Sequence, residues 1–280
     1  MNTQEKPLIL HEGRYTLADL EKLRKRIKIW KECDIYTNQL VELFEITHPA
    51  IPKSSIEYKK EFSRFRSERI VSNATLRGDW IYFPWSGFLV HALNQKDYLM
   101  LRTNRNRNLI TPEEQQKLDK FVVGIVGLSI GNAIATALVY SGIANTIKIA
   151  EHDILETSNL NRLRARIHEI GYPKLTLTEQ QIYEVNPYEN IISFSDGITK
   201  GNLGKFLSQP QPRLIFEAID DFEMKVRIRL AARNARIPII MLTNLGDRLL
   251  IDVERYDLEP KLAIFNGLIG TVPDKILSKP

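Results

Sequence analysis

The amino-acid sequence predicts an α/β protein with a doubly wound, mainly parallel sheet. Apolar segments of strand length alternate with segments of helical periodicity from residue 120 to residue 243. Continuous apolar strands of this kind are typical of a parallel sheet that helices cover on both faces. The first strand runs into a turn that contains Gly127, Ser129 and Gly131, and small residues follow at helical spacing. The segment at 248–257 alternates apolar and polar residues instead, which indicates an added antiparallel strand.

The first hundred residues are less regular and are rich in charged and aromatic side chains. Apolar residues at helical spacing predict a helix at 17–30, and we place the single cysteine, Cys33, on this N-terminal helix as a packing residue. A second helix is expected at 36–46, before a segment that contains two prolines. The segment at 78–93 predicts two short strands. We therefore expect a smaller, mainly helical region at the start of the chain.

The regular part of the chain predicts five parallel strands and the helices between them. The strands are expected at 121–126, 146–151, 191–194, 213–219 and 237–243. The helices are expected at 131–141, 174–185, near 203 and at 222–235. The change of pattern predicts two domains, an accessory region at 1–100 and the α/β domain at 101–280.

Composition and charge exclude several classes of protein. A single cysteine excludes a disulfide within the chain and a zinc site built from four cysteines. The start of the sequence lacks the basic and apolar segments of a secretory signal, and no apolar run approaches the ~20 residues of a membrane helix. A cytoplasmic protein without membrane association is expected. The net charge of +5 suits an anionic ligand or partner but does not by itself indicate nucleic acid.

The turn after the first strand of the regular region predicts a nucleotide site. Gly127 and Gly131 permit a tight turn, and the N-terminus of the following helix offers N–H groups to phosphate. Glu151 ends the second strand, 24 residues after Gly127, where an acidic side chain can bind ribose hydroxyls. The dinucleotide pattern G-x-G-x-x-G is nevertheless incomplete, because Ser129 and Asn132 replace its second and third glycines. An NAD(P)-dependent oxidoreductase is therefore kept only as an alternative.

The loop after the second strand, EHDILETSNLNRLRAR, is the most informative segment. It places Asn159, Arg162, Arg164 and Arg166 just beyond the end of the strand. Arginine forks chelate phosphate oxygens, and asparagine binds ribose or phosphate oxygens, so the segment suits a triphosphate. A solvated basic loop is the alternative interpretation.

This loop and its neighbours resemble the adenylation domain of the ThiF/MoeB and ubiquitin-activating-enzyme superfamily. The similar segments are GLSIGN, NTIKIAEHDILETSNLNR and the lysine of GYPK, with RTNRNRNLI before them and EAIDDFEMKVRI after them. The resemblance covers about residues 100 to 270 and implies a Rossmann-like version of the predicted sheet. The segment that precedes RTNRNRNLI is also similar to bacterial proteins in which such a domain precedes a nitroreductase-like domain.

The resemblance implies that a carboxylate attacks the α-phosphate of ATP to give an acyl-adenylate and pyrophosphate. The carboxylate would be the C-terminus of a ubiquitin-like or sulfur-carrier protein or of a peptide. ATP and Mg²⁺ are the expected cofactors. No nucleic-acid partner is expected, although a tRNA-linked carboxylate stays open.

The resemblance also implies a role for each matching residue. Asp220 would hold Mg²⁺, Lys174 and Arg162 would bind phosphates, and Asn159 would help to place the nucleotide. Arg105 matches an arginine that reaches the γ-phosphate from the partner subunit, which implies a homodimer. Glu151 and Asp153 match the acidic pair of the family, with Glu151 at the ribose. Gly127, Ser129 and Gly131 form the phosphate loop.

Several residues depart from the family pattern. Leu163, Asp221 and Lys225 stand where the family usually has Gln, Asn and Arg, and Ser129 and Asn132 replace glycines. No CxxC pair is present, so the structural zinc common in the family is not expected, and no cysteine after residue 33 can form a thioester. We expect an adenylyltransferase without a thioester step of its own. A catalytically inactive relative that binds only a nucleotide or a partner is the second alternative.

Overall fold

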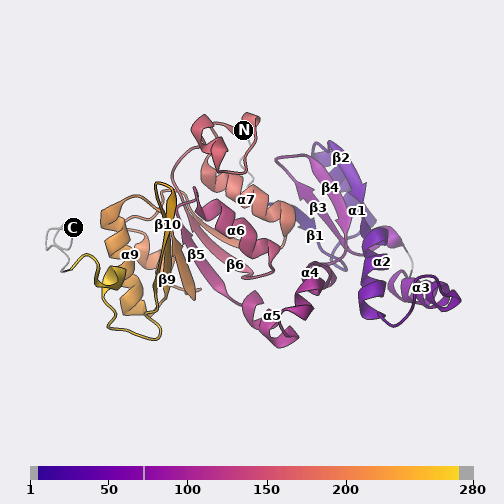
Figure 1. Ribbon diagram of the computed structural model, residues 1–280. Helices are drawn as coiled ribbons and strands as arrows, with labels where there is room; N and C mark the ends of the chain where they lie inside the picture. Colours follow the sequence, from indigo (N-terminus) through magenta and orange to yellow (C-terminus); the bar gives the residue numbers. More distant parts are fainter. Residues whose placement is uncertain (1–5, 72, 271–280) are drawn as a thin grey trace. The chain divides into compact units, whose positions relative to one another are not determined.

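The computed structural model describes residues 6–71 and 73–270 (Figure 1). The chain divides into two units, Met1–Pro112 and Glu113–Pro280. This division lies beyond residue 100, where the sequence pattern places the start of the α/β domain. The two predicted domains, 1–100 and 101–280, stay a prediction.

The first unit is built on a four-stranded sheet in the order β1-β3-β4-β2. Its strands are β1 (Leu8–Leu10), β2 (Lys31–Asp34), β3 (Asp79–Phe83) and β4 (Phe88–Ala92). Its helices are α1 (Leu17–Arg26), α2 (Tyr36–Thr47), α3 (Ile56–Arg69) and α4 (Gln95–Thr103). β3 and β4 form an antiparallel hairpin, and β2 runs parallel to β4. The first two helices and the hairpin are confirmed, whereas β1, β2, α3 and α4 were not predicted.

The placement of Cys33 on a helix is wrong. Helix α1 begins after Thr16, whose side chain accepts a hydrogen bond from the backbone N–H of Asp19, and the helix ends at Arg26. Ile27 is extended, with φ −110° and ψ 154°. Cys33 lies in β2, opposite Val90 of β4, and is partly exposed. Strand pairing therefore prevails over the apolar periodicity in this segment.

The second unit has a six-stranded sheet in the order β10-β9-β8-β5-β6-β7. Its strands are β5 (Val122–Val126), β6 (Thr146–Ala150), β7 (Asn190–Phe194), β8 (Leu214–Glu217), β9 (Ile239–Leu245) and β10 (Arg248–Glu254). Its helices are α5 (Pro112–Asp119), α6 (Gly131–Tyr140), α7 (Lys174–Val185), α8 (Leu203–Leu207) and α9 (Phe222–Ala235). β5 to β9 are parallel, and only β10 runs antiparallel to its neighbour. The predicted fold class is confirmed.

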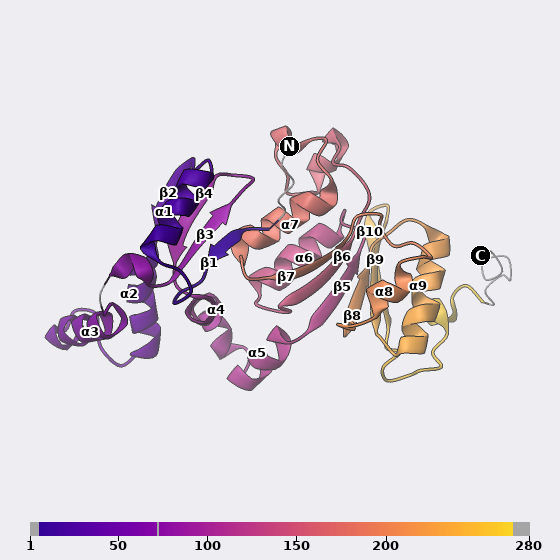
Figure 2. The same ribbon diagram turned by 180° about the vertical axis from the view of Figure 1, so that it is seen from behind.

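Helices cover both faces of this sheet, as residues of the central strand β5 show. A Cβ atom at Gly124 would lie 2.7 Å from the ring of Phe206 in α8, so Gly124 faces α8. A Cβ atom at Gly131 in α6 would lie 2.8 Å from Cγ2 of Ile125, so Ile125 faces α6. Consecutive strand residues point to opposite faces, and the sheet is therefore doubly wound. Figure 2 shows α8 beside α9, in agreement with the apolar cluster that joins them.

The centre of the sheet is a topological switch point. The chain continues from β5 to β6 on one side, and returns later to β8 on the other side of β5. The loops after β5 and β8 meet at the carboxyl edge, where Val126 pairs with Glu217. Open parallel sheets bind ligands in the crevice outside this edge. No helix in the described part of the chain has the length and apolar character needed to cross a membrane.

Candidate nucleotide site

The loop after β5 requires glycine at two positions. Gly127 has φ +85°, and a Cβ atom there would lie 2.4 Å from the carbonyl oxygen of Ala218. This contact joins the β5 loop to the β8 loop. At Gly131 the close approach of α6 to Ile125 leaves no room for a side chain. The two glycines thus fix the tight turn and the distance between α6 and the strand.

Asn132 replaces a fingerprint glycine with a contact between helices. Its side chain is buried, and Nδ2 donates to Oγ1 of Thr178 at 2.9 Å and to Oε1 of Gln181 at 2.8 Å. Both partners belong to α7. Asn132 therefore fastens α6 to α7. The substitution changes helix packing and leaves the loop glycine Gly127 in place.

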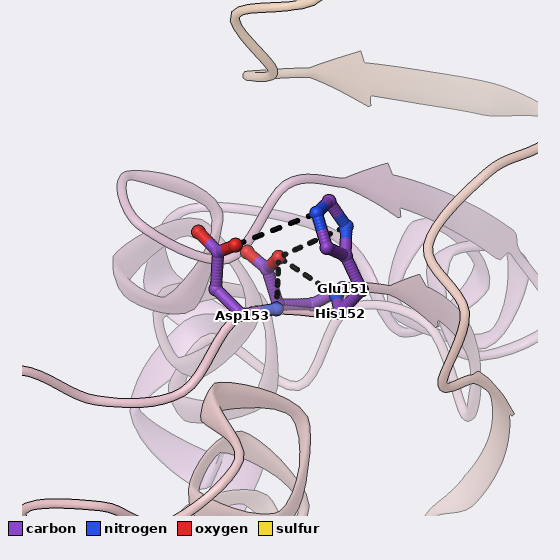
Figure 3. A group of neighbouring side chains, drawn as sticks. All are labelled: Glu151, His152 and Asp153. Carbon is purple, nitrogen blue, oxygen red and sulfur yellow. Dashed lines mark hydrogen bonds and ion pairs between the residues drawn. The ribbon is translucent and has the colours of Figure 1, made fainter.

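The loop is anchored by Glu151, the residue that follows β6. Oε2 of Glu151 accepts the backbone N–H of Leu128 at 2.8 Å. Oε1 accepts the backbone N–H groups of His152 at 2.8 Å and of Asp153 at 3.0 Å. The buried carboxylate thus closes the turn after β6 (Figure 3). Through Leu128 it also holds the loop after β5 against this turn. Its predicted contact with ribose stays a prediction.

Glu151, His152 and Asp153 also form a cluster of possible metal ligands. One ligand atom from each lies within 4.8 Å of the others (Figure 3). The electrostatic surroundings do not suit a cation, because N–H groups point at Glu151 and an ammonium group faces Asp153. We assign these residues to the support of the loop.

That ammonium group belongs to Lys174, the first residue of α7. Its Nζ lies 2.8 Å from Oδ2 of Asp153, and its backbone N–H donates to the carbonyl of Asp153 at 2.9 Å. Lys174 is buried, whereas the Asp153 side chain is half exposed. The hydrogen bond from Lys174 lowers the pKa of Asp153, with smaller contributions from the charges of Lys174 and His152. The ion pair therefore places the ammonium group of Lys174 at the edge of the loop.

The segment SNLNR brings Arg162 to the glycine loop. Asn159 is buried, and its Oδ1 accepts the backbone N–H of Glu156 at 3.0 Å, which closes a 3-10 turn at Thr157–Asn161. Nε of the exposed Arg162 then lies 3.3 Å from Oγ of Ser129. Its NH1 group donates to Oδ1 of Asn161 at 3.0 Å. The observed contacts give Asn159 a structural role, and its predicted contact with the nucleotide stays a prediction.

Asp220 lies in the loop between β8 and α9. It does not cap the helix, because the N-cap of α9 is Asp221, whose Oδ1 accepts the backbone N–H of Met224 at 3.1 Å. The Asp220 side chain is exposed. Within residues 6–71 and 73–270 no hydrogen bond or ion pair to its carboxylate is found. This carboxylate is therefore available at the switch point.

Two buried charged residues beneath this loop, Glu217 and Arg229, and the partly buried Lys225 were not predicted as site residues. Glu217 ends β8, and both Lys225 and Arg229 of α9 contact its carboxylate, at 3.0 and 2.9 Å. The sequence signal was present, because Lys225 and Arg229 lie four residues apart on one helix face. Arg105, in contrast, lies exposed in a 3-10 turn of the first unit, Asn104–Asn108. Its predicted role in the site stays a prediction.

A doubly wound sheet with a glycine turn at its switch point, flanked by arginine, lysine and a carboxylate, defines a Rossmann-like nucleotide-binding domain. The family comparison specifies it further. Residues 103–246, about half of the chain, match the ThiF family. The chain belongs to the ThiF family.

The chain is also similar to individual proteins. The chain is 38% identical over 193 residues to the uncharacterized protein MT1398 of Mycobacterium tuberculosis. This match covers 69% of this chain and 26% of that protein. The chain is 27% identical over 135 residues to the sulfur carrier protein ThiS adenylyltransferase of Bacillus subtilis, or 47% of this chain and 39% of that enzyme. The chain thus spans well under half the length of either relative.

One similar solved structure is that of the Escherichia coli tRNA N6-threonylcarbamoyladenosine dehydratase TcdA in complex with AMP. It matches with a TM-score of 0.50 and 22% identity, over 53% of this chain and 61% of that one. At this identity the likeness shows the shared fold.

Proposed function

We propose that this chain is an ATP- and Mg²⁺-dependent adenylyltransferase that activates a carboxylate as an acyl-adenylate. The approach of Arg162 to Ser129 carries the proposal, because it places a guanidinium group beside the glycine loop at the N-terminus of α6. The ThiS adenylyltransferase among the relatives supports this chemistry, and the AMP complex of TcdA supports an adenine nucleotide as the ligand. ThiF-family membership gives both inferences a common basis.

The reaction requires one anion to approach another. A carboxylate oxygen forms a bond to the α-phosphorus of ATP, and the bond from that phosphorus to the bridging oxygen breaks, so that pyrophosphate leaves. Catalysis depends on cations and on positioning, because the transition state spreads negative charge over phosphate oxygens. Arg162, Lys174 and the N–H groups at the start of α6 supply positive charge.

Asp220 suits a hard divalent cation. Its carboxylate is exposed while the neighbouring Asp221 is engaged as the helix cap, and Mg²⁺ in nucleotide sites binds one or two carboxylates together with phosphate oxygens. A bound Mg²⁺ would offset negative charge on the phosphates. Glu151 would keep the glycine loop in place and would accept ribose hydroxyls through its remaining lone pairs.

The adenylation domain has no cysteine that could accept the activated group. No cysteine follows Cys33 in the sequence, so we propose that the reaction of this chain ends at the adenylate. The substrate is then a protein or peptide with a C-terminal carboxylate. We further propose a cytoplasmic homodimer in which Arg105 of one copy serves the nucleotide of the other.

Calorimetric titration tests the nucleotide assignment. The protein is titrated with ATP in the presence and absence of Mg²⁺, and separately with NADH and NADPH. We expect Mg²⁺-dependent ATP binding that Arg162→Ala weakens. Arg213→Ala, an exposed arginine at the amino end of β8, serves as the control and should leave binding unchanged. Binding of NADH or NADPH without binding of ATP would overturn the proposal.

Pyrophosphate exchange then tests the reaction. Peptides with a free C-terminal carboxylate are compared with the same peptides as C-terminal amides. Exchange that depends on the free carboxylate is expected. Tight ATP binding without exchange for any carboxylate would favour an inactive relative.

A further inference from the structure

A chain of buried charges connects the loop that bears Asp220 with the last strand of the sheet. Arg229 of α9 is fully buried, and so are the carboxylates of Glu217 and Glu254. NH1 of Arg229 lies 2.9 Å from Oε2 of Glu217, and Nε lies 2.7 Å from Oε2 of Glu254. The guanidinium thus joins the end of β8 to the end of β10.

The Glu217 end of this network shapes the loop before α9. Oε1 of Glu217 accepts the backbone N–H of Ile219 at 2.9 Å, and Nζ of Lys225 lies 3.0 Å from the same atom. Ile219 directly precedes Asp220. The Glu217 carboxylate therefore determines where the backbone turns. This turn sets the backbone position from which the Asp220 side chain extends.

The Glu254 end holds a second segment near the same loop. Its Oε1 accepts the backbone N–H of Phe265 at 2.6 Å and the hydroxyl of Tyr256 at 2.5 Å. Phe265 and Asn266 are left-handed, with φ 52° and 50°. Asparagine tolerates this conformation, whereas a bulky residue such as Phe265 adopts it only when its surroundings enforce it. Glu254 supplies part of that enforcement.

Phe265 completes the connection. Its ring is stacked on the ring of Phe222 with centroids 5.8 Å apart, and the Arg229 guanidinium lies 3.9 Å from its centroid. Phe222 is the first residue of α9 and comes two residues after Asp220. Both ends of the charge network therefore reach the short loop that carries Asp220.

Stability alone gives a weak reason for such a network. Buried ion pairs seldom stabilise a fold more than apolar residues of similar volume, because both charges lose their hydration. Residues behind a metal ligand, in contrast, orient the ligand and tune its affinity for the metal.

We propose that Arg229 and Glu254 are positioning residues that fix Asp220 for a divalent cation through Glu217 and Phe265. The inference rests on the proposed function, because Asp220 is the metal-binding residue of that proposal. It adds a role for α9 and β10, neither of which supplies a group that contacts the nucleotide in that proposal.

Binding provides the test. Calorimetry measures ATP affinity over a series of Mg²⁺ concentrations and gives the Mg²⁺ concentration at half-maximal enhancement. Glu254→Gln keeps the side-chain shape and removes its charge. We expect it to raise this midpoint about tenfold, the lower range for residues behind a metal ligand. ATP affinity without Mg²⁺ should not change. In the Asp220→Ala background, Glu254→Gln should not change ATP affinity further at any Mg²⁺ concentration.

Two more variants keep the test decisive. Tyr256→Phe removes only the hydroxyl that contacts Glu254 and should raise the midpoint in the same direction; this variant decides if Glu254→Gln does not fold. Glu189→Gln is the matched control, a buried carboxylate before β7 that accepts a hydrogen bond from Asn186 at 2.6 Å. It should leave the midpoint unchanged.

Three results would overturn the inference. An unchanged midpoint with reduced thermal stability would make the network purely structural. An equal effect in the Asp220→Ala background would show that the network does not act through Asp220. Wild-type ATP binding that is indifferent to Mg²⁺ and to Asp220→Ala would reject the metal assignment itself, and with it this inference, before any network variant is compared.

Discussion

The backbone N–H of Leu128 donates to Oε2 of Glu151 at 2.8 Å, and this bond ties the glycine loop to the end of β6. An acidic residue at this position suggests from the sequence a contact with ribose. In the structure, three backbone N–H groups already use its two oxygens. The Glu151 carboxylate therefore stabilises the loop, in addition to any contact it makes with a ligand.

Asp220 and Asp221 should respond differently to substitution. Asp220→Ala removes an exposed carboxylate and should change the free energy of unfolding by less than ~0.5 kcal/mol, while Mg²⁺-dependent ATP binding is lost. Asp221→Ala removes the cap of α9 and should cost about 1 kcal/mol, with little effect on Mg²⁺ dependence. Urea unfolding and calorimetry measure the two quantities, and the reverse pattern would contradict the assignment.

Gly127→Ala should disrupt the loop after β5. The new Cβ atom would approach Ala218 O to 2.4 Å at φ +85°, so we expect a loss of more than ~2 kcal/mol in unfolding free energy. Gly204→Ala is the control, because Gly204 lies in α8 with no heavy atom within 4 Å of the new Cβ. It should stabilise the protein by ~0.5–1 kcal/mol. Equal effects of the two variants would argue against a constrained loop.

The ion pair between Lys174 and Asp153 should make stability pH-dependent on the acid side. Lys174 lowers the pKa of Asp153 below its ordinary value of 3.8. A carboxylate with a lowered folded pKa stabilises the fold fully above the unfolded pKa, and this contribution is lost as the pH falls through the folded pKa.

Lys174→Met should therefore be less stable than the wild type at neutral pH, and the difference should shrink below pH 3.8. The carboxyl carbon of Asp153, followed by NMR, should titrate at a higher pH in the variant. A constant stability difference across the acid range would show that the pair contributes no pH dependence.

Asn132→Gly restores the third glycine of the dinucleotide pattern and tests what that position does. It removes the hydrogen bonds to Thr178 and Gln181. We expect a loss of about 1–3 kcal/mol from the unpaired partners and up to ~1 kcal/mol from glycine in a helix. NADH should still not bind. Thermal unfolding and NADH titration check both statements, and a gain of NADH affinity would revive the dinucleotide alternative.

The sequence alone predicted most of the second unit. The predicted helices at 174–185 and 222–235 coincide with α7 and α9. Their apolar periodicity is bounded by a proline before α7 and by an aspartate cap before α9, which are local signals. Helix α3 was missed because it buries none of its residues and so lacks an apolar stripe. β1 has three residues, too few for a pattern.

Sequence order also placed Gly127 directly after β5, Glu151 directly after β6 and Asp220 in the loop after β8, and the ends of parallel strands meet at one edge of the sheet. Only the tertiary structure decided what those residues contact. Leu128 and Glu151 are 23 residues apart, and Asn132 and Thr178 are 46 apart. Such pairs depend on which strands become neighbours, on their register and on how closely the helices pack. These are properties of the whole sheet, whereas the periodicity that predicts each element resides in a few consecutive residues.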